Sequence, residues 1–484
     1  MALAHANETS PGRPPAAHWS RAFQNLPREH GFEPLRVEGT IPAELNGTFY
    51  GNGIGRVDCF GERYGHWFDG DGAVTGVRFQ GGRASGGVKL VQTPAFAREQ
   101  RAGRRLFGGY NTPLRRPFRE LLLNDLKTCA NTSMVLWQDR LFALSEAGLP
   151  FEIDGDDLAT LGERDLEGVL VRAFSAHPHA VPQRRALYGF GIAKMGPQVT
   201  LAAYELPAAG RPRPIVELKI PGPTAIHDFA ATERHLVFTI PPMRFSLLSL
   251  LFRRRGLMDS LVWRADEGTE IIVVPIDDPG ATFRVRTPAH MSEHVVNAFE
   301  EGGTLQFDFT RYDDMRGLEG HVGKLIAGIV EAPLASTLSR CIIDLKGKKV
   351  RFEERLSAPC ELPRVSPRVD AAAYRYCYLV GHSSREVSGQ RFFNAILKVD
   401  MERGQVERFV AGPSQLCGEA VFVPRREPVA EDDGYLVTMM SDVQDDRTCA
   451  AVFDARSVEA GPIARAWFDH AIPPGFHGQW AAQG

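Results

Sequence analysis

The stretch HDFAATERHLVFTI, residues 227–240, contains the pattern that decides the fold. A histidine and a short apolar run come first, a polar turn follows, and a second apolar run covers Leu236–Ile240. Two short apolar runs joined by a polar turn are typical of a β-hairpin. The unit recurs along the chain, whereas long helical periodicity is scarce, so we predict an all-β protein.

The second run of each unit is the easiest to recognise. Seven such runs occur at irregular intervals, which indicates a β-solenoid or a β-propeller with insertions. The intervals are too uneven for WD40 repeats. The seven runs are Val77–Phe79, Leu141–Leu144, Leu187–Phe190, Leu236–Ile240, Leu305–Phe309, Tyr376–Val380 and Tyr435–Met439.

The first run of most units is preceded by, or begins with, a residue suited to a metal site. In a propeller the innermost strands of all blades surround one axis, so residues at their starts form a ring at one face. Distant residues would therefore meet at one point. These starts are Asn131-Thr132-Ser133, His177-Pro178, His227-Asp228, His294-Val295, Glu361-Leu362 and Glu419-Ala420, and the first unit has His66-Trp67-Phe68-Asp69 instead.

The last segment, GFHGQW at 475–480, carries a further histidine. A terminal strand there would complete the first blade and remove an open sheet edge. We expect a flexible tail over 1–29 and a single propeller domain over 30–484. Segments 94–126 and 241–262 look helical and would cap one face.

Four histidines head or close these units: His177, His227, His294 and His477. Neutral imidazole suits iron, zinc, copper and nickel. Their shared position in the repeat, more than any local motif, predicts that they bind one metal ion. His179 is the nearest competitor, and we prefer His177 because it heads its run.

Three glutamates lie at an equivalent depth: Glu146, Glu361 and Glu419. A metal-bound histidine usually donates its second ring N–H to a carboxylate or carbonyl, which fixes the ring. We expect these glutamates to orient the histidines.

The composition excludes some partners and compartments. The hydrophobic share of 43% fits a soluble globular protein, and the net charge of -3 argues against nucleic acid. Seven cysteines without a CxxC pair fit reduced thiols in the cytoplasm. We find no membrane-spanning stretch, although the apolar and basic segment 245–255 could rest on a membrane surface.

Several motifs together resemble the carotenoid cleavage oxygenases, from about residue 30 to 480 and in that family's order. They include Asn52-Gly53, His66-Trp67-Phe68-Asp69-Gly70-Asp71-Gly72, Ala130-Asn131-Thr132, Ser145-Glu146, Ala176-His177-Pro178, Ile226-His227-Asp228-Phe229, His294 with Asn297-Ala298-Phe299-Glu300, Glu361-Leu362-Pro363-Arg364, Gly418-Glu419 and Gly475-Phe476-His477-Gly478.

The resemblance implies a seven-bladed β-propeller with a helical or loop cap over the metal-site face. It implies one Fe(2+) per chain on the four histidines, with Glu146, Glu361 and Glu419 orienting His227, His294 and His477 respectively. By the same analogy, the methyl group of Thr132 crowds one coordination site. The implied reaction is cleavage of a carbon–carbon double bond of a carotenoid or apocarotenoid by O2, giving two carbonyl products.

Other functions stay open at this point. Relatives that cleave hydroxystilbenes hold the phenol with a lysine and a tyrosine; Lys127 could be that lysine, but Leu90 stands near the expected tyrosine. A metal-free propeller could serve as an interaction scaffold. A zinc hydrolase is a weaker alternative, because a fourth histidine would fill the position that its water needs.

Overall fold

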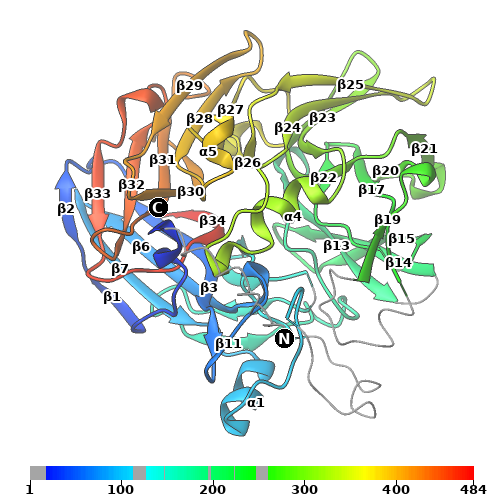
Figure 1. Ribbon diagram of the computed structural model, residues 1–484. Helices are drawn as coiled ribbons and strands as arrows, with labels where there is room; N and C mark the ends of the chain where they lie inside the picture. The colour runs from blue at the N-terminus through cyan, green and yellow to red at the C-terminus, as the bar shows by residue number, and fades with distance from the viewer. Residues whose placement is uncertain are drawn as a thin grey trace, which may run out of the picture.

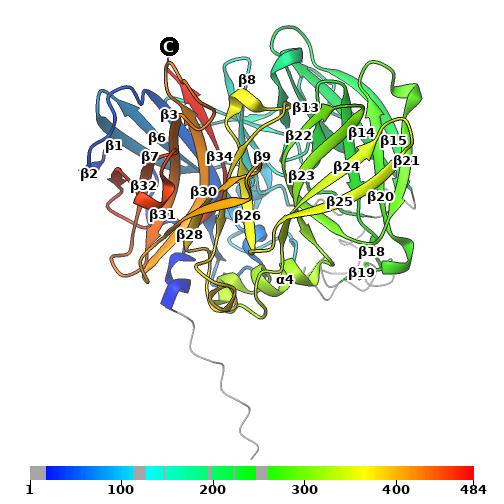
Figure 2. The ribbon, with the colours of Figure 1, turned by 90° about the horizontal axis from the view of Figure 1, so that it is seen from above.

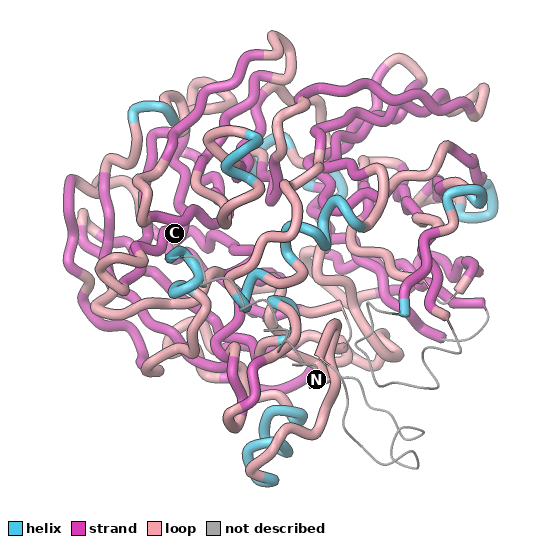
Figure 3. Tube along the Cα trace, in the orientation of Figure 1, coloured by secondary structure: helices cyan, strands magenta, loops and turns pink. Residues whose placement is uncertain are grey.

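The computed structural model describes residues 18–112, 127–146, 148–194, 198–222, 224–246 and 260–483. Seven antiparallel sheets are arranged around one axis as the blades of a propeller (Figure 1). The innermost strands of neighbouring blades contact one another around the ring. Strands dominate the described chain and the helices are short (Figure 3).

The first four blades are formed as follows, from the innermost strand outward. Blade I contains β34 (Gly475–Ala482), β3 (Gly47–Arg56), β6 (Asp71–Gln80), β7 (Arg83–Leu90) and β1 (His30–Pro34); blade II contains β8 (Ser133–Trp137), β9 (Arg140–Leu144), β10 (Phe151–Ile153) and β11 (Thr160–Glu163); blade III contains β12 (His179–Val181), β13 (Ala186–Lys194), β14 (Gln198–Pro207) and β15 (Arg213–Pro221); blade IV contains β16 (Phe229–Ala231), β17 (His235–Ile240), β20 (Thr269–Pro275) and β21 (Phe283–Thr287).

The remaining three blades follow the same order. Blade V contains β22 (Met291–Glu301), β23 (Thr304–Tyr312), β24 (Thr337–Asp344) and β25 (Lys349–Leu356); blade VI contains β26 (Cys360–Arg364), β27 (Tyr376–Gly381), β28 (Ala395–Asp400) and β29 (Gln405–Val410); blade VII contains β30 (Gln415–Pro424), β31 (Gly434–Asp442), β32 (Arg447–Asp454), β33 (Ala464–Trp467) and β2 (Arg36–Gly39).

The seven apolar runs are strands, as predicted. In blades II to VII each run lies in the second strand, and in blade I the run Val77–Phe79 lies in β6, which pairs with β3. The start of the first unit is different: Trp67–Asp69 forms a short 3-10 helix, η2, and not an inner strand. The innermost strand of blade I is β34.

Both ends of the described chain close the ring. Strand β34 pairs with β3 of blade I, which confirms the predicted closing strand. In addition, β1 adds an outer strand to blade I, and β2 pairs with β33 at the outer edge of blade VII. Because sheet edges are prone to pair with other chains, this double closure protects the joint.

The hydrophobic core lies mainly between blades. Phe190 of blade III meets Phe229 and Phe238 of blade IV, with ring centroids 5.5 and 5.8 Å away. Burying one such side chain contributes about 1.5–3 kcal/mol. Repeated packing of this kind fixes the angle between neighbouring blades, and therefore the direction in which the inner strand ends point.

The cap lies at one face of the propeller (Figure 2). It includes helix α4 (Arg316–Val322) and a two-stranded sheet of β18 (Met243–Phe245) and β19 (Leu261–Trp263). We expected a helix over 241–262, but both ends of that segment are strands, and 247–259 lies outside the described residues. Of the other expected cap segment, 94–126, the structure describes helix α1 (Pro94–Ala102) and residues up to 112.

The remaining short elements lie in turns and loops. They are η1 (His18–Ala22), β4 (Asp58–Cys59), β5 (Glu62–Arg63), η3 (Pro182–Arg184), η5 (Ala265–Glu267), η6 (Pro279–Ala281), η7 (Leu325–Ala327), η8 (Pro367–Val369), α5 (Arg385–Ser388) and η9 (Val458–Ala460).

The expected flexible tail over 1–29 is wrong for residues 18–29, and its first part, 1–17, lies outside the described residues. Residues 18–29 are packed on the propeller: Phe23 is fully buried against Trp67 and Phe392, and the indole of Trp19 donates to the carbonyl of Gln390 at 2.8 Å. Large aromatic side chains bury enough surface to hold such a segment in place.

Two further observations concern the environment. In the described part of the chain, none of the helices has the length and apolarity needed to cross a bilayer. All seven cysteines are free thiols.

Candidate metal centre

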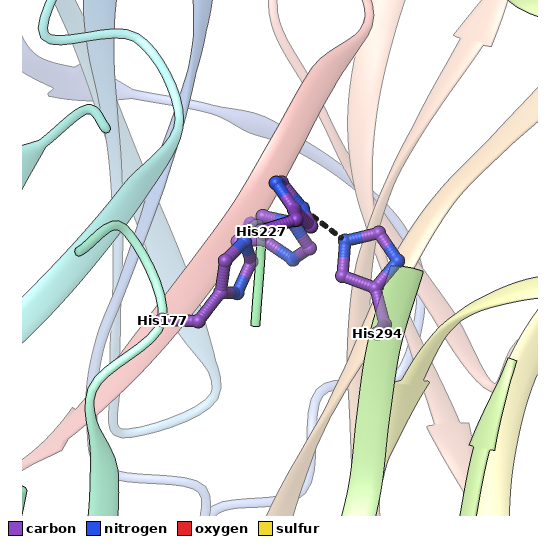
Figure 4. A group of neighbouring side chains, drawn as sticks. His177, His227 and His294 are labelled. Carbon is purple, nitrogen blue, oxygen red and sulfur yellow. Dashed lines mark hydrogen bonds between the residues drawn. The ribbon is translucent and has the colours of Figure 1, made fainter. Parts of the chain in front are cut away.

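Four imidazoles meet on the propeller axis. His177 and His227 stand two residues before the inner strands β12 and β16, while His294 and His477 lie within β22 and β34. Nitrogen atoms of all four rings lie within 4.8 Å of one another. Figure 4 shows His177, His227 and His294 turned toward a common centre. The structure therefore brings together the four histidines singled out in the sequence.

Asp228 explains why His179 stays outside this group. Its carboxylate accepts a hydrogen bond from Nε2 of His179 at 2.7 Å and from the backbone N–H of Val295 at 2.7 Å. These bonds join the starts of the inner strands of blades III, IV and V. His179 thus helps to hold the ring of strands together. Its Nε2 is bonded to Asp228 and is therefore not available to a metal ion.

Each of three histidines has a carboxylate behind it. Nδ1 of His227 contacts Glu146, Nδ1 of His294 lies 2.6 Å from Glu361, and Nδ1 of His477 lies 2.8 Å from Glu419. A carboxylate at Nδ1 holds the proton on that nitrogen and leaves the Nε2 lone pair free. These three pairs agree with those that the family resemblance had implied.

Two of these carboxylates are held by further residues. The hydroxyl of Tyr312 donates to Glu361, and the guanidinium of Arg364 donates to Glu419 at 3.0 Å. Burial opposes ionisation, but the contact with His294 keeps the pKa of Glu361 below its usual value, and Arg364 brings that of Glu419 to about 2. Arg364 belonged to a quoted motif without a role, and nothing in the sequence pointed to Tyr312.

The charge state of the imidazoles suits a metal ion. Burial lowers the pKa of His177 well below its usual value and that of His477 to about 4, so both are neutral. At His227 burial acts in the same direction, but Glu146 and Glu293 outweigh it and raise the pKa to about 10. The carboxylates beside His227 therefore favour positive charge at this point of the site, while His177 and His477 offer neutral nitrogen atoms.

The ring nitrogens themselves provide the test of fit. Nε2 of His177 is buried and has no hydrogen-bond partner among the described residues. Nε2 of His227 and Nε2 of His294 lie 3.1 Å apart. A divalent cation between them would satisfy these lone pairs, whereas burying unpaired polar atoms is costly. The donor set is that of a metal-binding site.

Thr132 lies beside the centre, at the wall of the cavity. Its backbone N–H donates to the carbonyl of Leu144 at 3.0 Å, and its own carbonyl accepts from the N–H of His477 at 3.1 Å. These bonds hold Thr132 between blade II and the closing strand β34.

A cavity of about 290 Å³ opens between the histidines and the cap. Its walls are mostly apolar and aromatic, with Phe68, Tyr110, Phe245, Met315 and Leu318 among them. Such a cavity suits a lipophilic ligand with few polar groups. The cap elements β18, β19 and α4 form one side, so they contribute to the shape of the cavity.

Two acidic residues of the cavity wall had escaped the sequence analysis. Glu319 on α4 accepts a hydrogen bond from the hydroxyl of Tyr110 at 3.1 Å. Glu293 precedes His294 on β22, and its Oε1 lies 3.8 Å from Nε2 of His227. Burial raises the pKa of Glu293 to about 7. Its position next to His294 was the only signal in the sequence.

Lys127 also lines the cavity, but its ammonium group is engaged elsewhere. It lies 2.7 Å from Asp71 and 3.0 Å from Glu99, and it contacts the hydroxyl of Tyr64. Leu90 is buried between strands of blade I and does not line the cavity.

Comparison with known proteins agrees with this architecture. The family model described as retinal pigment epithelial membrane protein matches residues 23–482. Apocarotenoid-15,15'-oxygenase of Synechocystis is 33% identical over 96% of both chains, and lignostilbene-alpha,beta-dioxygenase isozyme III of Sphingomonas paucimobilis is 30% identical over 92% of this chain and 93% of that one. Isoeugenol monooxygenase of Pseudomonas putida is 28% identical over 93% of this chain and 94% of its own.

Solved structures give the same result. A mutant of the Synechocystis apocarotenoid oxygenase superposes with a TM-score of 0.87 at 32% identity, covering 96% of this chain and 98% of that one. A cobalt-substituted form of the same oxygenase superposes with a TM-score of 0.86, again at 32% identity and with the same coverage. With its matching sequence, its seven blades and its four central histidines, this chain belongs to the carotenoid cleavage oxygenase family.

Proposed function

We propose that this protein is a non-haem Fe(II) dioxygenase that cleaves a carbon–carbon double bond of a carotenoid or apocarotenoid, giving two carbonyl products. The observation that carries the proposal is the convergence of four histidines beside an apolar cavity, three of them in its wall. The Synechocystis relative, an apocarotenoid oxygenase by name, supports the substrate class. The cobalt-substituted form of that oxygenase supports a metal ion in this chain as well.

Each residue of the site has a defined task in this proposal. His177, His227, His294 and His477 hold the ion, and Glu146, Glu361 and Glu419 keep three of the rings in place. The bound iron supplies the O2 chemistry. The apolar walls exclude water and position one double bond beside the ion, and Thr132 borders the position left open for O2.

Iron is preferred over zinc because of the ligand count. Structural zinc is satisfied by four tetrahedral ligands, while catalytic zinc keeps three protein ligands and a water. Four imidazoles would leave zinc without that water. Iron accepts further ligands beyond four, so O2 can still bind.

The stilbene alternative has weaker support from the residues of this chain. The relatives named lignostilbene dioxygenase and isoeugenol monooxygenase support the stilbene alternative. However, Lys127 is only 7% exposed and its charge is already matched by Asp71 and Glu99. Binding a phenol there would require breaking a buried ion pair, which is costly.

The decisive experiment combines metal analysis with product analysis. We expect about one iron per chain after anaerobic purification, and carbonyl fragments from a panel of apocarotenoids and hydroxystilbenes incubated under ¹⁸O2. Label in both fragments of an apocarotenoid supports the proposal. Cleavage of stilbenes alone would move the substrate to the second class, and a metal-free protein would indicate a scaffold.

We also propose a reducing, cytoplasmic location and peripheral contact with membranes. The seven free cysteines support the first point. For the second, segment 245–255 is apolar and basic, but beyond Ser246 it lies outside the described residues. Changing Leu247 and Leu251 to Asp should weaken binding to anionic liposomes, and unchanged binding would contradict membrane contact.

A further inference from the structure

Glu293 is a buried carboxylate for which the proposed chemistry has no use. The residue is 8% exposed and lines the cavity beside the four histidines. The other acidic groups of the cavity wall have partners: Glu146 and Glu361 contact histidines, Glu319 accepts from Tyr110, and Asp69 accepts from the hydroxyl of Thr112. For Glu293, the described residues provide no hydrogen bond, and its one ion-pair contact among them is with His227 at 3.8 Å.

The direction of this contact is informative. Oε1 of Glu293 faces Nε2 of His227, the nitrogen that points to the proposed metal, at 3.8 Å. If that nitrogen binds a metal ion, it has no proton to offer Glu293. A buried carboxylate without a partner is costly, so it needs a cation or a donor. The nearest cation would be the metal itself.

The distances place Glu293 at the edge of the ligand set. Ligand atoms about 2.1 Å from one ion lie at most about 4.2 Å apart, and the separation from His227 falls within this limit. The group whose atoms all lie within 4.8 Å of one another contains the four histidines and not Glu293. The carboxylate is therefore beside the ligand set, on the side of the cavity.

We propose that Glu293 is a removable fifth protein ligand, which occupies the open position of the metal when the cavity holds no substrate. This inference rests on the metal site of the proposed function, but not on the identity of the substrate. Carboxylates are suitable ligands for Fe(II), and a glutamate side chain has enough rotatable bonds to leave. A substrate entering the cavity displaces it and frees the position for O2. The metal would thus meet O2 mainly when substrate is present.

The test uses nitric oxide as a probe of the open position on the anaerobic Fe(II) protein without substrate. A position that is free only part of the time lowers the apparent affinity of a ligand by that fraction. Glu293→Gln keeps the shape but removes the charge, and we expect it to bind nitric oxide about tenfold more tightly than the native protein. Electron paramagnetic resonance of the nitrosyl signal measures this. The visible spectrum of the Co(II)-loaded protein should change in the same variant.

Glu319→Gln is the matched control, because it makes the same chemical change on the same cavity wall. Its carboxylate contacts Tyr110 and His66, so its nitric oxide affinity should equal that of the native protein. Glu293→Asp is a second test variant: it keeps the charge but shortens the reach, so it should also bind nitric oxide more tightly.

The outcomes separate this inference from the proposed function. Equal nitric oxide affinities and equal Co(II) spectra in the native protein, Glu293→Gln and Glu293→Asp would overturn the role of Glu293 and leave the oxygenase intact. A native protein that takes up no metal would overturn both. Tighter binding in the Glu293 variants, in a protein that cleaves no polyene, would support the inference and contradict the substrate.

Discussion

Two groups of buried or partly buried side chains in this protein look alike as potential metal sites. The first is His177, His227, His294 and His477; the second is Cys59, Asp71 and Glu99. In both, the candidate ligand atoms lie within 4.8 Å of one another. Proximity alone therefore does not distinguish them.

The difference lies in where the protein places its own positive charge. In the second group the ammonium of Lys127 sits among the carboxylates, 2.7 Å from Asp71 and 3.0 Å from Glu99, and takes the place of a cation. In the first group the guanidinium of Arg364 lies outside, bonded to Glu419 behind His477. The carboxylates contact three of the histidines from outside, at Nδ1, and leave the Nε2 atoms of those rings facing the centre. A cluster of ligands binds a metal only if its facing atoms are not already satisfied.

Removing one central imidazole should have the largest effect. We expect His227→Ala to abolish both iron retention and cleavage, because it removes a direct ligand together with the partner of Glu146. Iron per chain, measured by plasma mass spectrometry, and product formation provide the readout. His179→Ala is the control: that ring bonds Asp228 outside the group, so the variant should retain its iron. Normal cleavage by His227→Ala would refute the site.

Removing the internal cation of the second group should affect stability and not metal content. Lys127→Met leaves Asp71 and Glu99 buried without their counter-ion, and breaking such a pair typically costs about 3–5 kcal/mol. Urea unfolding should show this loss, while iron stays near one per chain. An unchanged unfolding free energy would mean that Lys127 is not the cation that satisfies this group.

A substitution behind a ligand should have a smaller effect than loss of the ligand. Glu361→Gln keeps the shape but loses the charge that orients His294, and we expect iron affinity or rate to fall by about 10–100-fold. Tyr312→Phe, which removes only a bond to Glu361, should lower them less. Chelator competition measures the affinity. Native affinity in Glu361→Gln would show that the carboxylate does not support the site.

The sequence predicted the parts of the fold that repeat. Runs such as Leu236–Ile240 are buried on both faces between blades, so they are continuous and apolar and easy to find. Strand β2, Arg36–Gly39, has no such run, because it is an exposed outer strand whose place depends on pairing with β33. Residues 18–29 resembled a tail for the same reason: tertiary contacts hold them, such as the packing of Trp19 and Phe23 and the hydrogen bonds of Asn25.

The same logic applies to the site. The histidines and the glutamates Glu361 and Glu419 were visible because they occupy similar places in the repeated unit, within the inner strands or just before them. Tyr312 and Arg364 reach the carboxylates from strand ends of blades V and VI, and no repeat or spacing reveals that approach. The only signal for Glu293 in the sequence was its position next to His294. Glu293 lies in the register shift of β22 between Ser292 and Val295, which the sequence does not reveal.

The smallest effect should come from an ion pair near solvent, which tests how much burial matters in the comparison above. Glu152 on β10 accepts from Arg140 at 2.7 Å and from Arg164 at 2.6 Å, and hydrogen bonds from these arginines lower its pKa to about 2. A pKa depressed in the folded state stabilises the protein above the unfolded value near 4.5, and this contribution disappears as the pH falls toward about 2. Because solvent screens the pair, we expect Glu152→Gln to cost about 1 kcal/mol of unfolding free energy at pH 7 and almost nothing near pH 2.

A double-mutant cycle with Arg140→Gln, measured by urea unfolding at several pH values, isolates the interaction between Glu152 and Arg140. A coupling energy that stays constant between pH 7 and pH 3 would show that these arginines do not hold the carboxylate ionised. The difference in stability between this exposed pair and the buried pairs of Lys127 would then not depend on charge.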